Sequence, residues 1–412
     1  MLEPLLSQTW KYDGKVTTDW DRVFAPRTRR MKSSAIRELL KLTMQPDIIS
    51  FAGGMPAPEL FPVREFREAC AYILKNEAEV ALQYGPTEGV PRLKELLAEK
   101  MQKYGVPAVR ENILLTNGSQ QALDLIGRVF LQEGDVVVTS EPTYLGAIQA
   151  WNAYGPRFVT VPLDEHGMVT EELEKALMQH PSAKFIYVLP NFHNPAGVTE
   201  SLERRQHIVE LAVRYGVFLV EDDPYGELRF EGEDITPLVV MHKENTFYLS
   251  TFSKTLSPGI RLGWLVAPEA IMTRFIQAKQ GMDLHTSTFL QMIAADVMER
   301  GILRQHVKRI REVYKDRRDV MLASMEEYFP DGVTWTRPEG GLFLWVRMPE
   351  QADSEQVLAA AVEEKVAFVP GHAFYPNGGG RNTMRLNFSN AKPDRIQEGI
   401  RRLGRAISRQ LG

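Results

Sequence analysis

The chain has 412 residues, of which 44% are hydrophobic and 25% are charged, a composition typical of soluble globular proteins with a large core. The formal net charge of −4 gives no reason to expect nucleic-acid binding, and Cys70, the single cysteine, excludes an intramolecular disulfide and a thiolate-rich metal site. The sequence contains no apolar run near 18 residues and no N-terminal signal pattern, so we expect a cytoplasmic protein.

The N-terminal part of the chain is mixed and polar. A basic cluster at residues 27–32 is interpreted as a solvated lead-in to a short helix that ends near residue 42, and an anion or membrane contact is the alternative. The run FAGGMPAPELFP (51–62) is too rich in glycine and proline for a regular element. Gly53 and Gly54 allow another group to approach the backbone closely.

The middle of the chain alternates between apolar, strand-like runs and helical patterns. Buried strands that alternate with helices predict an α/β fold with a mostly parallel, seven-stranded sheet covered by helices on both faces. In such a sheet, ligands bind outside the carboxyl ends of the strands. The predicted strands are 113–116, 136–139, 158–161, 185–189, 217–220, 247–249 and 261–268, and the main helices are 63–75, 91–104, 120–130, 144–154, 171–180 and 202–215.

Polar and aromatic residues follow most of these strands. The turn at 117–120 opens a helix, and small residues at a helix N-terminus form an anion site, although a plain N-cap at Ser119 is the alternative. Each of the other residues has an ordinary interpretation as a packed ring, a turn residue or a solvated charge. Their shared position at one edge favours a single ligand site, which would include Tyr144, Asn194, Asp222, Tyr225, Lys254 and Arg261.

Lys254 follows the strand 247–249 and is flanked by hydroxyl residues. A lysine amine becomes a nucleophile when burial or a neighbouring cation lowers its pKa, and it can then form a Schiff base with a carbonyl. Arg261 supplies the planar cation that suits a phosphate. A surface lysine in a loop is the alternative. Taken together, this edge offers what pyridoxal phosphate requires: an anion cradle, a stacking face, partners for the phenolic oxygen and ring nitrogen, and an amine.

These motifs resemble those of one family, the fold-type I pyridoxal-phosphate aminotransferases of class I/II, over nearly the whole chain. The shared motifs, in family order, are GSQQ (118–121), EPTY (141–144), NPAG (194–197), EDDPY (221–225) and SKTLSPGIRLGW (253–264). Within the family, the chain is most similar to the 2-aminoadipate and kynurenine/aminoadipate aminotransferases. That similarity rests on SAIRELL (34–40), FAGGMPAPELFP, LQYGPTEG (82–89), GLFLWV (341–346) and PNGGGRNTMRL (376–386).

The resemblance implies a role for each matching residue. Lys254 would bind the cofactor covalently and later move the α-proton, Asp222 would pair with the pyridinium nitrogen, and Tyr144 would stack on the ring. Asn194 and Tyr225 would hydrogen-bond its phenolic oxygen. The phosphate would be held by Gly118, Ser119, Gln120, Ser253 and Arg261, with Thr251 in support, and by Tyr84 of the partner subunit in a homodimer with shared active sites.

The C-terminal third is predicted to form a smaller α+β domain. We expect an N-terminal segment over 1–62 that packs with this small domain, a large cofactor-binding domain over 63–304, and the small domain over 305–412. In the strand 383–389, Arg385 alternates with apolar neighbours, so it sits either on a wet face or in a site. The resemblance implies that Arg385 grips the substrate α-carboxylate.

Two further positions concern the substrate. The resemblance implies that Arg37 meets a distal carboxylate, with a surface or dimer salt bridge as the alternative. Gly54 and Asn194 complete the predicted substrate contacts. His285 and His372 have no acidic or histidine partners at metal-ligand spacing, so we expect no metal.

The predicted activity is transfer of an amino group between an L-amino acid (2-aminoadipate, glutamate, leucine or aromatic) and a 2-oxo acid such as 2-oxoglutarate. One rival is a lyase or decarboxylase on the same fold, although Arg385 argues against decarboxylation because it would retain the carboxylate. A second rival is an aminotransferase-like regulator, which needs a DNA-binding domain before residue 34, where this chain has too little sequence.

Overall fold

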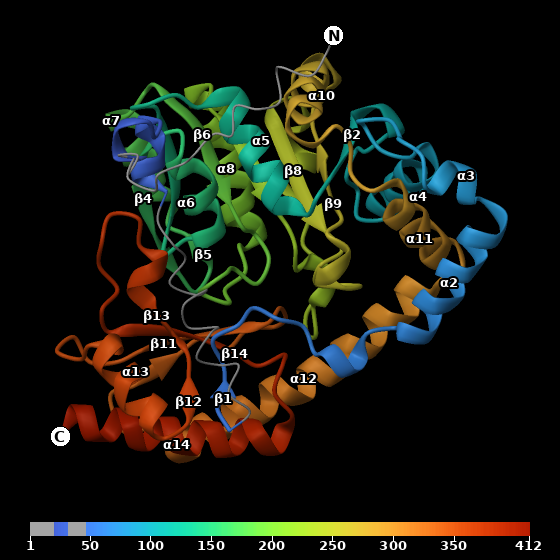
Figure 1. The fold of residues 1–412 in the computed structure, drawn as a ribbon. Helices are drawn as coiled ribbons and strands as arrows, with labels where there is room; N and C mark the ends of the chain where they lie inside the picture. Colours follow the sequence, from blue (N-terminus) through green and yellow to red (C-terminus); the bar gives the residue numbers. More distant parts are fainter. Residues whose placement is uncertain (1–19, 32–46) are drawn as a thin grey trace, which may run out of the picture.

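The computed structural model describes residues 20–31 and 47–412. A large mixed sheet flanked by helices lies beside a small antiparallel sheet, and the long helix α12 (Ile302–Tyr328) runs from one to the other (Figure 1). The helix predicted to end near residue 42 lies outside the described residues. Within the two described ranges, no helix combines the length and apolarity needed to span a bilayer.

The large sheet contains all seven predicted strands. Its five central strands, from β8 to β4, are mutually parallel, whereas β9 runs antiparallel to both of its neighbours. An eighth strand of two residues, β5, pairs with β4 and was not predicted because it is too short to show a pattern. The order across the sheet is β2 (Ile113–Thr116), β9 (Gly263–Val266), β8 (Thr246–Thr251), β7 (Phe218–Asp222), β6 (Ala183–Val188), β3 (Val136–Glu141), β4 (Arg157–Asp164) and β5 (Gly167–Met168).

Helices cover both faces of this sheet, because successive side chains along each strand point to opposite sides. Val220 belongs to the core beneath one set of helices and Leu219 to the core beneath the other. The first face carries α5 (Ser119–Phe130), α6 (Leu145–Asn152) and α10 (Glu269–Asp283). The second carries α7 (Thr170–Gln179), α8 (Leu202–Tyr215), α9 (Leu238–Met241), α4 (Pro91–Gln102) and α11 (Thr288–Glu299), with α2 (Val63–Asn76) and α3 (Ala78–Ala81) packed beyond them.

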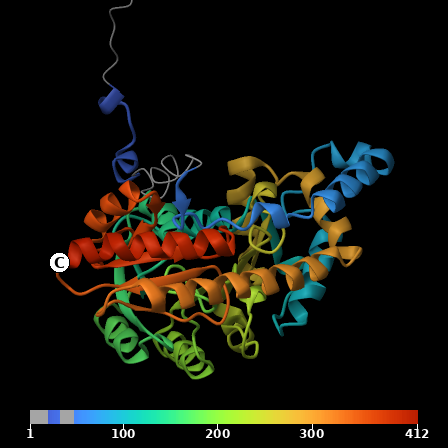
Figure 2. The same ribbon diagram turned by 90° about the horizontal axis from the view of Figure 1, so that it is seen from below.

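The small sheet packs on two long helices. Its strand order is β10 (Thr334–Trp335), β11 (Phe343–Arg347), β14 (Thr383–Asn387) and β13 (Val369–Pro370), and every pair is antiparallel. A separate pair joins β1 (Ile49–Ser50) to β12 (Val366–Ala367). Helix α12 lies alongside α14 (Pro393–Leu411), as seen from below in Figure 2, and α13 (Ser354–Glu363) completes the layer. The division of the chain at residues 62 and 304 stays a prediction.

The strand directions bring distant segments together at one edge of the large sheet. Because β9 lies between β2 and β8 and runs opposite to both, Gly263 at its start pairs with Thr116 and Thr251 at their carboxyl ends. The segments that follow β2 and β8 therefore meet the segment that precedes β9, and these segments carry Ser119, Lys254 and Arg261. This edge faces the small sheet.

Candidate active site

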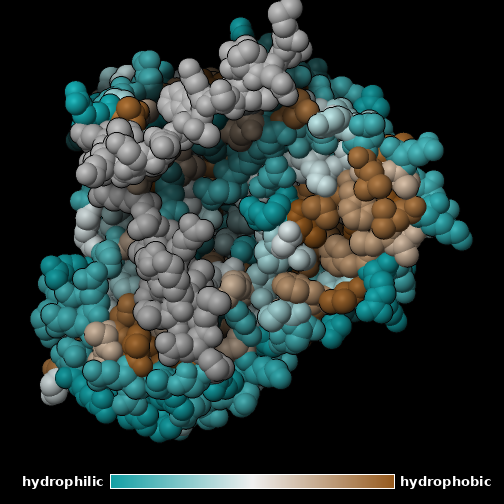
Figure 3. Space-filling view, viewed as in Figure 1, coloured by the Kyte–Doolittle hydropathy of each residue, from teal (hydrophilic) through white to brown (hydrophobic). Residues whose placement is uncertain are grey.

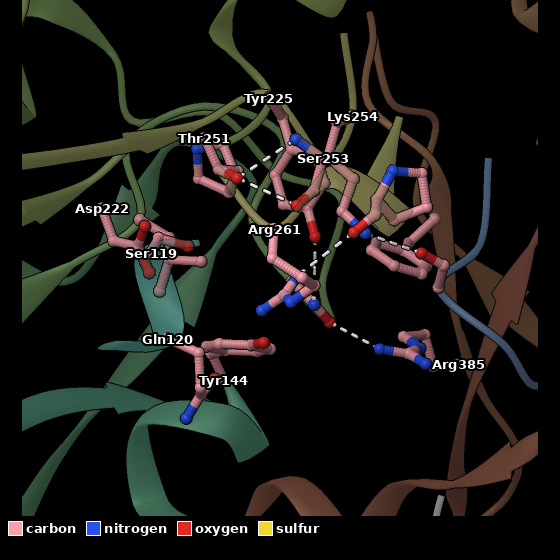
Figure 4. A pocket seen from close by; sticks show the side chains of 16 residues that line it. Ser119, Gln120, Tyr144, Asp222, Tyr225, Thr251, Ser253, Lys254, Arg261 and Arg385 are labelled. Carbon is pink, nitrogen blue, oxygen red and sulfur yellow. Dashed lines mark hydrogen bonds between the residues drawn. The ribbon is translucent and has the colours of Figure 1, made fainter. Parts of the chain in front are cut away.

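A cavity of about 320 Å³ lies between the carboxyl edge of the large sheet and the small sheet (Figure 4). In Figure 4, Asp222 and Ser119 lie on one side, and Arg385 enters from the opposite side. Three predicted site residues do not line the cavity. Gly118 directly precedes the lining residue Ser119, Tyr84 is 78% exposed on the surface, and Arg37 is outside the described residues. The lining residues are Gly54, Ser119, Gln120, Tyr144, Leu189, Asn194, Asp222, Pro224, Tyr225, Thr251, Ser253, Lys254, Pro258, Arg261, Phe343 and Arg385.

One end of the cavity is built to receive an anion. Ser119 and Gln120 form the first turn of α5, where backbone N–H groups have no partner within the helix. Arg261 lies against this turn and donates a hydrogen bond to the carbonyl of Asn117 at 3.3 Å. A Cβ atom on Gly118, whose φ is +75°, would stand 2.7 Å from the Arg261 guanidinium. Glycine is therefore required here for both the turn and the close approach of the cation.

The hydroxyl of Thr251 stabilises the loop after β8 through hydrogen bonds to backbone groups. It accepts the N–H of Ser253 at 3.1 Å and donates to the carbonyl of Leu262 at 2.9 Å. These bonds fix Ser253, which is buried, at the wall of the cavity. Thr251 itself also lines the cavity, and the supporting phosphate contact predicted for its hydroxyl stays a prediction.

Lys254 is the nucleophile candidate of the site. Its Nζ donates a hydrogen bond to the carbonyl of Gly54 at 2.7 Å, so the loop of residues 51–62 closes over the amine. Burial, and then the positive charges of Arg385 and Arg261, lower the pKa of the Lys254 amine to about 8. An amine with this pKa is roughly one-tenth unprotonated at pH 7, far more than an ordinary lysine, and the unprotonated amine is the form that attacks a carbonyl.

Asp222 offers a carboxylate at the far side of the cavity. It shares the sheet face of Val220 and accepts a hydrogen bond from the Tyr187 hydroxyl at 2.8 Å through Oδ2. Its other oxygen, Oδ1, is buried and has no hydrogen-bond partner among residues 20–31 and 47–412. Burial raises the pKa of Asp222 to about 7. A protonated ring nitrogen fits this unpartnered oxygen, because it would satisfy the oxygen and stabilise the charge together.

The two neighbouring carboxylates, Glu221 and Asp223, are held by neutral donors. Three consecutive carboxylates repel one another unless nearby groups compensate their charge, and here the direct partners are N–H and hydroxyl groups rather than cations. Glu221 points to the opposite sheet face and accepts the N–H groups of Leu238 and Val239 at 3.0 and 2.8 Å. Asp223 accepts hydrogen bonds from the Asn191 amide and the Tyr248 hydroxyl, among others. The alternation of the strand leaves Asp222 alone to face the cavity.

Arg385 is fully enclosed, so the interpretation of a wet face is wrong. It donates to the Asn194 side-chain oxygen at 2.8 Å and to the carbonyl of Ala52 at 2.9 Å, and its guanidinium lies 4.2 Å from the centre of the Phe343 ring. Burial lowers the pKa of Arg385 to about 10, which leaves it charged at neutral pH. Its Nε is buried and has no hydrogen-bond partner in the described part of the chain.

Asn194 connects the two ends of the site. Its amide nitrogen donates to the Tyr225 hydroxyl at 3.3 Å, while its oxygen accepts from Arg385. The Tyr225 ring packs edge-on against Phe343, at a centroid distance of 5.9 Å. One amide therefore fixes both a phenol beside Asp222 and the cation across the cavity.

Sequence reasoning missed Tyr187 and Phe343. Tyr187 lies within β6 rather than after it, so the rule that examines strand ends passes over it. The signal was a hydroxyl within an otherwise apolar strand. Phe343 belongs to the motif GLFLWV, which was used for resemblance but not assigned to the cavity.

Comparison with known proteins agrees with this geometry. A family model described as aminotransferase class I and II matches residues 47–403. Aromatic-amino-acid aminotransferase 1 of Thermococcus litoralis is 47% identical over 401 residues, which are 96% of each chain. The structure of Pyrococcus horikoshii kynurenine aminotransferase has a TM-score of 0.92 and 46% identity, and the match covers 96% of this chain and 99% of that one. The α-aminoadipate aminotransferase of Thermus thermophilus has a TM-score of 0.89 and 42% identity, with 95% and 99% covered.

The same comparisons identify the cofactor. The Pyrococcus enzyme was solved with PMP and the Thermus enzyme with N-(5'-phosphopyridoxyl)-L-leucine. The residues of this chain fit pyridoxal phosphate, because the cavity pairs a cationic turn with an accessible lysine amine and an unpartnered carboxylate oxygen. With the family model, the relatives and the cavity in agreement, the chain belongs to the class I and II aminotransferases and is a pyridoxal-phosphate-dependent transaminase.

Proposed function

We propose that this transaminase moves an amino group from 2-aminoadipate, glutamate, leucine or an aromatic amino acid to a 2-oxo acid, with 2-oxoglutarate as the acceptor. The observation that carries the proposal is Arg385, a buried cation that lines the same cavity as Lys254. A substrate whose α-carboxylate pairs with Arg385 would present its amino group and α-hydrogen toward Lys254. The names of the relatives, which include aromatic-amino-acid and 2-aminoadipate aminotransferases, support the aromatic and 2-aminoadipate donors.

The proposed roles in holding the cofactor follow the contacts of the cavity. Ser119, Gln120, Ser253 and Arg261 would hold the phosphate, with Gly118 allowing Arg261 to approach. Tyr144 would stack on the ring, and Asn194 and Tyr225 would donate hydrogen bonds to its phenolic oxygen. Asp222 would keep the ring nitrogen protonated through its unpartnered oxygen.

Lys254 would act twice in the reaction. It would first hold the cofactor through its amine and, once displaced by the substrate amino group, would carry the proton from the substrate Cα. When bound, pyridoxal phosphate supplies an aldehyde for the amino group and a ring that accepts the electron pair of the Cα–H bond. The lowered pKa of Lys254 supports this role, because a free amine is required to accept the proton. Arg385 would retain the carboxylate and so favour proton removal over decarboxylation.

Spectra of the half-reaction test the transaminase assignment against a lyase. An aminotransferase given an amino acid without an acceptor should convert one equivalent per site to the 2-oxo acid and then stop, with loss of the aldehyde absorbance. Adding 2-oxoglutarate should restore that absorbance. A lyase would release product continuously without an acceptor, and this result would refute the proposed function.

The substrate side chain would occupy the part of the cavity near Gly54 and Phe343. A Cβ on Gly54 would stand 3.1 Å from the Phe343 ring, so the glycine keeps this wall open. Arg37 is proposed as the partner of a distal carboxylate, on the basis of the resemblance alone. Steady-state kcat/KM for 2-aminoadipate, glutamate, leucine and phenylalanine with 2-oxoglutarate as acceptor would rank the donors.

We further propose that the active form is a homodimer. Apolar side chains are exposed along one side of the molecule, over α2 and α3, and this side is brown in Figure 3. They are Val63, Tyr72, Leu74, Val80 and Leu82, and the exposed Tyr84 follows them. A second copy seated on this face would cover them and bring Tyr84 to the partner's cofactor phosphate. Sedimentation should give twice the 46.8 kDa chain mass, and a monomer with full activity would refute the proposal.

A further inference from the structure

An ion pair between a buried lysine and a partly exposed aspartate lies behind the anion end of the cavity. Lys279 and Asp283 stand four residues apart on α10, and the lysine Nζ lies 2.8 Å from each carboxylate oxygen. The Lys279 side chain has no solvent exposure. Neither residue is among those that line the cavity. A buried ion pair is weak evidence for stability in itself, because desolvation offsets the attraction, so its other contacts indicate its role.

The carboxylate of this pair reaches the turn between β2 and α5. Asp283 Oδ2 accepts hydrogen bonds from the amides of Asn117, at 2.5 Å, and Gln121, at 2.6 Å. The Gln121 oxygen in turn accepts from the Asn117 N–H at 2.7 Å and from Lys279 at 3.2 Å. Asn117 and Gln121 flank Gly118, Ser119 and Gln120. Both ends of the phosphate turn are therefore tied to one ion pair.

The end of α10 is itself fixed by the residues that follow. Leu284 adopts φ +67° and ψ −60°, an uncommon conformation for a branched residue, and this ends the helix immediately after Asp283. His285 Nδ1 lies 2.8 Å from the carbonyl of Thr286 and so carries the hydrogen. Its Nε2 then accepts the N–H of Gly85 at 3.2 Å. The position of the Asp283 carboxylate is thus set by the loop of Gly85 as well as by α10.

We propose that the Lys279–Asp283 pair is a positioning element for the cofactor phosphate. It holds Asn117 and Gln121 so that the N–H groups and hydroxyl between them stay directed into the cavity. This inference rests on the proposed phosphate site at Ser119 and Gln120. A pair with only a structural role would change stability, whereas a positioning pair changes the phosphate-dependent part of cofactor affinity.

The test compares pyridoxal phosphate with pyridoxal, which lacks the phosphate, in absorbance titrations of the apoprotein. The double variant Lys279→Met, Asp283→Leu replaces the ion pair by apolar side chains of similar volume, a change that is often tolerated. The dissociation constant of pyridoxal phosphate should rise about 10- to 100-fold, the usual effect of losing a supporting contact. That of pyridoxal should change by less than about threefold. Asp283→Asn, which keeps one oxygen acceptor, should give a smaller loss with the same selectivity and serves if the double variant does not fold.

Two controls separate the possible failures. Lys175→Met with Glu172→Leu removes an exposed ion pair on α7 and should change neither affinity. Ser119→Ala removes a proposed direct phosphate contact and should weaken pyridoxal phosphate alone. If Ser119→Ala does so but the Lys279 and Asp283 variants weaken both ligands equally or neither, the positioning role is wrong. If Ser119→Ala leaves the affinity unchanged as well, the proposed phosphate site falls together with the inference.

Discussion

Tyr187→Phe tests how the protein keeps Asp222 charged. The tyrosine hydroxyl donates the only described hydrogen bond to the Asp222 side chain, at 2.8 Å. The ring itself packs edge-on against Trp151 at 5.1 Å and keeps this contact in the variant, so the change removes one donor and leaves no large cavity. A hydrogen bond to a charged group contributes about 1.5–3 kcal/mol. If all of it is lost in the transition state, kcat/KM falls roughly 10- to 150-fold.

The variant should also change the pH dependence of the activity. Without the hydroxyl, the charged form of Asp222 loses a partner, and the pKa of its carboxyl rises further above about 7. Since the neutral acid cannot stabilise a protonated ring nitrogen, kcat/KM should fall first at the low end of a series between about pH 6 and 9. Tyr154→Phe, which removes a hydroxyl bonded to Asp124 away from the cavity, is the matched control. Activity within twofold of wild type and an unchanged pH profile would show that the Tyr187 hydroxyl does not act on Asp222.

Four other outcomes are expected. Lys254→Ala should abolish turnover with an unchanged circular dichroism spectrum. In the wild-type apoprotein, the rate of cofactor capture should rise with pH, reach half its maximum near pH 8 and level off as the amine loses its remaining protons; a rise that continues to pH 10 would contradict the lowered pKa. Asp222→Asn should lower kcat/KM by the equivalent of about 3–5 kcal/mol, because the protonated ring nitrogen would lose its buried partner, while cofactor affinity changes far less. A variant that is fully active once resupplied with cofactor would make Asp222 a binding residue only. Arg37→Ala should lower kcat/KM by the equivalent of about 2–3 kcal/mol with acidic donors and by much less with leucine. Equal losses for both donors would show that Arg37 does not contact the substrate side chain. Inactive Tyr84→Ala subunits mixed with inactive Lys254→Ala subunits should regain activity, because one site of each mixed dimer is intact, and no recovery would argue against shared sites.

The sequence predicted the candidate site well because of one property of parallel sheets. Residues that follow such strands converge in space however far apart they lie in the chain, so Ser119, Asn194, Asp222 and Lys254 could be grouped without coordinates. The rule works only for strand ends. Tyr187 lies inside a strand, so its contact with Asp222 depends on which strands are neighbours and on their register.

Helices α10 and α11 were not predicted, for a different reason. Most of α11 is buried, so its sequence lacks the alternation of apolar and polar faces by which a surface helix is found. In α10 the buried face includes the charge of Lys279, which hydrophobic periodicity counts as exposed. The sequence also did not show which of the three consecutive carboxylates would face the cavity. That depends on the backbone N–H groups of α9 that bind Glu221, and their position is not visible in the sequence.

The walls of the cavity have separate origins, and this separation affects how the enzyme can diverge. Ser119, Asp222 and Lys254 belong to the edge of the large sheet, whereas Arg385 and Phe343 come from strands of the small sheet. On the proposed roles, mutations that alter the substrate wall leave the cofactor wall intact. Such a separation would let the amino donor change while the cofactor stays bound, and relatives of similar fold do bear the names of aromatic, aminoadipate and kynurenine aminotransferases.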